Sequence, residues 1–170
     1  TRHALGEFPE HAVFLKDEAR GLGILFRALG GDPALILVPA EPRHFRVRRR
    51  FLQKLAGTHR KFEMAWRDDE NLRLPERLAI FPSKHLNRAL YLWLAALAAT
   101  PAPGNTSWFT SNQALVQNVL ASWPGLENVY QRLVTQVLQW RPDPGDLEGQ
   151  EAVRELAIRQ ALIHPGSVQK

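Results

Sequence analysis

The stretch that most constrains the fold of this chain is residues 89–99, where every side chain is apolar (ALYLWLAALAA). A helix that is apolar on all sides has to be buried. These eleven residues are too few to cross a bilayer, which takes about 20. Residues 90–99 are therefore predicted to form the central helix of a soluble domain. Ser83, which follows Pro82, is the predicted N-cap of the helix that contains this stretch, because its hydroxyl can accept a hydrogen bond from a free backbone N–H.

Length and composition describe an ordinary folded domain. The chain has 170 residues, 45% of them hydrophobic and 23% charged, and it is predicted to be a single domain over residues 1–170. It contains no cysteine, which excludes disulfides, thiolate metal sites and cysteine nucleophiles. No signal peptide or membrane span is recognised, so we expect a cytoplasmic, bacterial protein. The chain begins at Thr1 and its only methionine is Met64, which leads us to expect a piece of a longer protein.

Apolar periodicity predicts a mainly α fold. About six helices are expected, five of them in addition to the central one. Those five are predicted at residues 9–29, 43–56, 107–122, 126–140 and 146–163, the last one capped by Asp146.

The β content is predicted to be small. Residues 35–38 form a short apolar run that is typical of a buried strand. Residues 61–67 alternate polar and apolar side chains, and residues 72–74 resume that alternation after an acidic turn, which predicts an antiparallel hairpin. Residues 78–81 are a candidate third strand. The expected class is therefore mainly α with a small antiparallel hairpin or three-stranded sheet, a minor α+β element.

The charge of the chain is concentrated in one segment. The formal net charge is +5, and residues 43–61 contain lysines and arginines but no acidic residue. On the predicted helix the candidate partner-binding residues, here called the basic face, are Arg43, Arg46, Arg49, Arg50 and Lys54. An acidic protein, nucleic acid and solvent alone are the three alternatives for what this face meets. No exposed aromatic residue lies between the arginines, which leaves base stacking without a platform.

A second candidate surface is polar but nearly uncharged. Between residues 101 and 140 the only charged residues are Glu127 and Arg132. The cores of protein interfaces are depleted in charge, so outward amide side chains in this region are candidates for partner binding. We call the candidates the glutamine set: Gln113, Gln117, Gln131 and Gln136. An ordinary polar helix surface is the alternative.

Motifs of catalysis are missing from the sequence. The six histidines form no HExxH pair, and there is no GxSxG elbow, phosphate-binding loop or GxGxxG sequence. We therefore expect no catalytic residue, no metal site and no cofactor, that is, a protein that is not an enzyme.

Several segments together carry a family resemblance. They are PEHAVFL at residues 9–15, LGILFRALGGDP at 22–33, RRRFLQKLAG at 48–57, and LRLPERLAIFP with LNRALYLWLAALAA between 72 and 99. In these segments the chain resembles the N-terminal region of the NorD/CbbO family. Members of this family work beside a MoxR-type AAA+ ATPase, in the activation of nitric oxide reductase or the reactivation of inhibited Rubisco.

The resemblance implies an adaptor. In such families the C-terminal part is a von Willebrand factor A (VWA) domain, whose DxSxS metal motif engages the substrate protein, and this chain contains no DxSxS. It therefore resembles the N-terminal part alone, which is expected to seat the adaptor on the ATPase hexamer. Rubisco or nitric oxide reductase would be bound through the VWA domain. The Rubisco branch is slightly favoured, with carboxysome association as a further expectation. A nucleic-acid-binding helical module that uses the basic face is the competing hypothesis.

Overall fold

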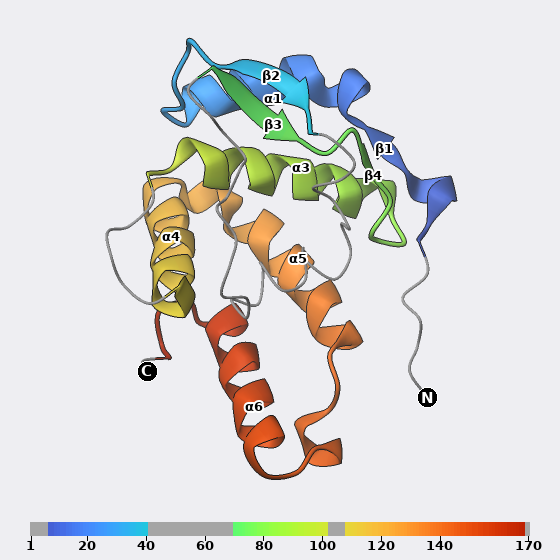
Figure 1. Cartoon of the computed structure of the whole chain (residues 1–170), viewed down its shortest axis with the longest axis vertical. Helices are drawn as coiled ribbons and strands as arrows, with labels where there is room; N and C mark the ends of the chain where they lie inside the picture. The colour runs from blue at the N-terminus through green and yellow to red at the C-terminus, as the bar shows by residue number, and fades with distance from the viewer. Residues whose placement is uncertain (1–6, 41–69, 102–107, 169–170) are drawn as a thin grey trace.

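The computed structural model describes residues 7–40, 70–101 and 108–168 (Figure 1). The described residues form helices with two short two-stranded sheets, which confirms the mainly α class with minor β content. The strands are β1 (Val13–Phe14), β2 (Ile36–Pro39), β3 (Asn71–Leu74) and β4 (Arg77–Leu78). The helices are α1 (Leu15–Ala28), α3 (Lys84–Ala99), α4 (Trp108–Ser122), α5 (Glu127–Trp140) and α6 (Gly149–Ile163). Short 3-10 turns are η1 (Pro9–His11), η3 (Pro124–Leu126) and η4 (Pro144–Asp146).

Helix α3 is the centre of the fold. It runs between a layer formed by α1 and the strands and a second layer that contains α4 and α5 (Figure 1). Leu90, Tyr91 and Trp93 have no exposed surface, so the predicted buried helix is confirmed. The indole ring of Trp93 lies against the ring of Tyr130 on α5, with their centroids 4.9 Å apart.

The start of α3 is held by an asparagine rather than by the predicted serine cap. Ser83 occupies the N-cap position, but its hydroxyl makes no capping hydrogen bond. Asn87, which is fully buried, accepts hydrogen bonds from the backbone N–H groups of Ile80 (3.1 Å) and Phe81 (3.0 Å). Its amide nitrogen donates to the carbonyl oxygens of His11 (2.8 Å) and Phe81 (3.0 Å). The Asn87 side chain thus uses both N–H donors of its amide nitrogen and both lone pairs of its amide oxygen, and it connects the N-terminal segment to the start of α3.

The first predicted helix begins later than expected. Residues 9–14 form η1 and strand β1, and β1 pairs antiparallel with β4 (Val13 with Leu78, Phe14 with Arg77). The periodicity of residues 9–14 predicts a helix, but their pairing with the distant strand β4 outweighs it. The predicted stop after this helix is confirmed, because Gly30 follows α1 with a φ of 87°, a conformation that glycine adopts without strain.

The strand pairing differs from the predicted hairpin. Strands β2 and β3, at the predicted positions 35–38 and 72–74, pair with each other in parallel, with Ile36 opposite Asn71. The predicted first arm of the hairpin, residues 61–67, lies outside the described residues, as does the predicted helix 43–56. The strand expected at residues 35–38 is present but only partly buried, since Leu35 is buried and Leu37 packs against the core whereas Ile36 is 64% exposed.

The C-terminal helices follow the predictions with one correction. Helices α4 and α5 confirm the predicted ranges 107–122 and 126–140. Asp146 was wrongly predicted as the cap of the last helix. It belongs to η4, a turn in which the Asp143 carboxylate accepts the Gly145 N–H at 2.8 Å, and α6 starts three residues later at Gly149. Pro144 at the first position of the turn favours this separate element.

Replacing the buried asparagine tests its role. We expect Asn87→Ala to lower the free energy of unfolding by about 2–4 kcal/mol, because two buried N–H groups and two carbonyls lose their partner. Asn128→Ala, at an exposed position of α5, is the matched control and should change it by less than about 0.5 kcal/mol. Urea unfolding of both variants measures the difference. Equal, small effects would show that the Asn87 contacts do not stabilise the fold.

The two tyrosines of the chain give a second test. The hydroxyl of Tyr91 donates to the Pro75 carbonyl at 2.7 Å, and that of Tyr130 donates to the Leu162 carbonyl at 2.6 Å. Burial, with smaller effects from nearby glutamates, raises the pKa of both phenols well above the ordinary value near 10.

Because the raised pKa favours the neutral phenol in the folded state, its contribution to stability is complete below about pH 10 and decreases at higher pH. Absorbance at 295 nm should therefore show no tyrosinate until the chain unfolds, and both tyrosines should ionise in that single step. Tyrosinate formed near pH 10, with the far-UV circular dichroism still native, would contradict the described burial.

Candidate functional site

Gln113 of the glutamine set does not face outward as predicted. Its side chain is buried, with 6% of the residue exposed. The amide nitrogen donates to the carbonyl oxygen of Val168 (3.0 Å), and the amide oxygen accepts the N–H of Gly166 (2.9 Å). Gln113 therefore holds the segment after α6 against α4. Its side-chain amide bonds one backbone C=O and one backbone N–H of that segment, as the backbone of a neighbouring strand would.

The other three glutamines do not form one surface. Gln117 is exposed, and its side chain lies over Gly166, where a Cβ atom would collide with it. Gln131 is exposed and donates to Glu127 at 3.0 Å, whereas Gln136 is half-buried and donates to Gln139 at 3.2 Å. Gln131 and Gln136 lie about 140° apart around α5. Partner binding by the glutamine set stays a prediction. The four glutamines do not share the single outward surface on which that prediction was based.

The basic face lies outside the described residues, so the structure does not test it. Arg43, Arg46, Arg49, Arg50 and Lys54 all fall within residues 41–69. Acidic residues outnumber lysine and arginine in the described stretches, and the positive excess of the chain comes mainly from residues 41–69. Binding of an acidic protein or of nucleic acid by this segment stays a prediction.

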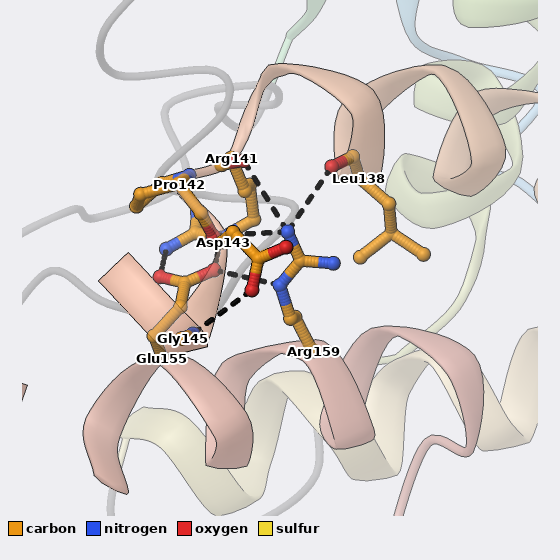
Figure 2. A network of polar contacts seen from close by, with 7 residues as sticks. All are labelled: Leu138, Arg141, Pro142, Asp143, Gly145, Glu155 and Arg159. Atoms are coloured by element: carbon orange, nitrogen blue, oxygen red, sulfur yellow. Dashed lines mark hydrogen bonds and ion pairs between the residues drawn. The ribbon is translucent and has the colours of Figure 1, made fainter. Parts of the chain in front are cut away.

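The most developed polar cluster joins α5 to α6, and sequence reasoning missed it. Figure 2 shows Arg141, just after α5, facing Glu155 of α6. The guanidinium donates from Nε to Oε1 and from Nη2 to Oε2, both at 2.7 Å, which is the bidentate geometry of a strong ion pair. Glu155 is 5% exposed and the Arg141 side chain is 18% exposed, so both partners of this pair are largely removed from water.

A second arginine completes the cluster. Arg159 Nη2 lies within hydrogen-bond reach of the carbonyl oxygens of Leu138 (3.4 Å), Arg141 (3.2 Å) and Pro142 (3.0 Å) (Figure 2). Its Nε lies 3.4 Å from Glu155 Oε1. A cation at a helix C-terminus satisfies carbonyls that have no partner within the helix. The only local sequence signal was the i,i+4 spacing of Glu155 and Arg159.

The cluster fixes the geometry of the junction between α5 and α6. Both carboxylate oxygens of Glu155 are bonded to arginine, so this carboxylate is held in place between α5 and α6. Among the described residues no group of three or more histidine or acidic side chains lies close enough to hold a metal ion. In the same part of the chain, no helix has the length and apolar character needed to span a membrane.

Comparison with known proteins finds six relatives that are similar to this chain, among them the following three. An uncharacterized protein of Pseudomonas aeruginosa is 44% identical over 170 residues, which is 100% of this chain and 28% of the relative. Protein NorD of Stutzerimonas stutzeri is 44% identical over 168 residues, covering 99% of this chain and 27% of that protein. Protein NorD of Brucella abortus is 32% identical over 147 residues, covering 80% of this chain and 23% of that protein.

The chain thus spans less than a third of the length of these relatives. The matched part lies in their N-terminal region. No family model matches the chain, and no solved structure matches it. The names of the relatives favour the NorD branch of the resemblance, and the Rubisco branch stays a prediction.

Removing the charge of Glu155 tests the junction between α5 and α6. We expect Glu155→Gln to lower the free energy of unfolding by about 3 kcal/mol, because two arginines then lack their counter-charge in a largely buried place. Glu151→Gln, one turn earlier on α6 and exposed, is the matched control and should be nearly neutral. Guanidinium unfolding of both variants measures the difference. A loss as small as that of the control would mean that the ion pair contributes little to stability.

Proposed function

Because the chain matches the N-terminal region of NorD proteins and so belongs to the NorD family, we propose that it is an accessory region in the activation of nitric oxide reductase. In this role it is an adaptor rather than an enzyme. The observation that carries the proposal is the 44% identity over 168 residues with a protein named NorD. Such a match covers the whole core described above, α3 and the helices around it.

The proposed partner is the hexamer of a MoxR-type AAA+ ATPase. The ATPase would supply mechanical work, and the adaptor would transmit it to the protein that is being activated. An adaptor of this kind has to keep its shape under load. The buried bonds of Asn87 and the ion pairs of Glu155 support that requirement, because the first connect segments far apart in the sequence and the second fix α6 against the end of α5. The basic face remains the proposed contact with the ATPase.

Co-elution with the ATPase tests the proposal. We expect this chain, mixed with a MoxR-type ATPase of the same organism, to elute with the hexamer in size-exclusion chromatography with light scattering in at least one nucleotide state. The experiment is run with ATP, with ADP and without nucleotide. Separate elution in all three states would contradict docking by this region.

Charge reversal tests which surface docks. The double variant Arg46→Glu/Arg50→Glu should weaken co-elution by about tenfold or more while the thermal unfolding temperature stays nearly unchanged. Arg132→Glu, at an exposed position of α5, is the control for a general charge effect. If the double variant binds as the wild type does, the basic face is not the docking surface.

A further inference from the structure

Helix α6 presents apolar side chains on both of its sides. Toward the core it buries Ile158 and Leu162. Toward solvent it exposes Val153 (67%), Leu156 (55%) and Ile163 (41%), here called the α6 stripe. At 100° per residue the three stripe residues lie within an arc of about 80° and extend about 15 Å along the helix.

The arc of the α6 stripe contains no charged residue. Gly149 and Gln160 lie within this arc, Ala152 lies just beside it, and Ala157 and Arg159 flank it at equal angles on its two sides. The charged residues of α6 project to its flanks or to the inward side, where Glu155 and Arg159 form the cluster described above. An ordinary surface helix also buries apolar residues inward, but it carries charged or polar residues on its outward side. Single exposed apolar residues are common, but an aligned and uncharged set marks an interaction surface.

The described chain leaves this stripe uncovered and fixes its direction. The Arg141–Glu155 pair sets the position of α6 against α5. Residues 166–168, which follow the helix, run back along α4 because Gln113 binds them. In Figure 1, α6 lies at the end of the molecule opposite to α1 and the strands, without a layer on its outer side.

The size of the stripe indicates which kind of partner it fits. Three aliphatic side chains on one helix bury on the order of a few hundred Å². A stable complex between separate proteins buries about 1,200 Å² or more, so two copies of this chain would not associate through the α6 stripe alone. A partner in the same polypeptide needs less area, because covalent linkage supplies an effective concentration in the millimolar range.

We propose that the α6 stripe is the surface on which the region that follows this one in NorD-type polypeptides packs. The relatives supply such a region, since this chain corresponds to only 27–28% of two of them and matches their N-terminal part. The expected contact surface of that region is apolar and small. The inference rests on the proposed place of the chain in a NorD-type protein.

Cysteine labelling in a full-length context tests this packing. The host is Stutzerimonas NorD in which the matched segment is replaced by this chain, which itself contains no cysteine. Leu156→Cys is made in the chimera and in the chain alone, and its reaction with N-ethylmaleimide is followed by peptide mass spectrometry. Arg20→Cys, at an exposed position of α1 on the opposite end of the molecule, is the matched control.

We expect Leu156→Cys to react about tenfold more slowly in the chimera than in the chain alone. Arg20→Cys should react at the same rate in both. Equal rates at position 156 in the two contexts, with native circular dichroism, would overturn the proposal. Slow labelling in the chain alone that becomes faster on dilution would overturn it as well, since a second copy would then cover the stripe. Val153→Cys repeats the measurement if Leu156→Cys does not fold.

The two proposals fail in distinguishable ways. Co-elution of the chimera with the ATPase hexamer is measured on the same samples. A chimera that binds the ATPase but leaves position 156 reactive overturns only the packing of the α6 stripe. A chimera that protects position 156 but never binds the ATPase contradicts only the docking role.

Discussion

The fold depends on the need to keep α3 out of water on every side. A helix that presents Leu90, Tyr91 and Trp93 in different directions requires a layer on each of its faces. Helix α1 and the short strands cover one side, and α4 and α5 cover the other (Figure 1). The remaining elements are arranged around this requirement, and even the buried phenol of Tyr130 belongs to a residue whose ring packs on Trp93.

Polar groups fix the geometry that the apolar core leaves open. Asn87 connects η1 to the entry of α3, Tyr130 connects α5 to the end of α6, and Glu155 connects α6 to Arg141. Each of these bonds is directional and mostly removed from water, so a change in the relative position of two elements would leave a buried group without its partner. This set of connections suits a protein region proposed to transmit force.

Sequence reasoning placed the helices better than it placed the functional residues. Periodicity located α3, α4 and α5 because each needs one or more apolar faces along a continuous segment. It did not assign Gln113, since the partner of its amide is the backbone of Gly166 and Val168, more than fifty residues away. It also did not reveal the α6 stripe, because an exposed and a buried apolar residue look alike until the neighbours of the helix are known. The alignment with NorD proteins depends on the residues themselves and was anticipated by the resemblance.

The sequence by itself determined that the segments of α3, α4 and α5 are helical, that the helix at residues 90–99 is buried, and that the positive charge is concentrated between residues 43 and 61. These properties follow from local composition and from spacing along a single helix, which need no knowledge of neighbours. Only the tertiary structure decided that Val13 and Phe14 pair with Leu78 and Arg77 and that β2 runs parallel to β3. It alone decided that α6 turns an uncharged face to solvent. Strand pairing, ion pairing and exposure are relations between distant segments, so their energies depend on where the whole chain places those segments.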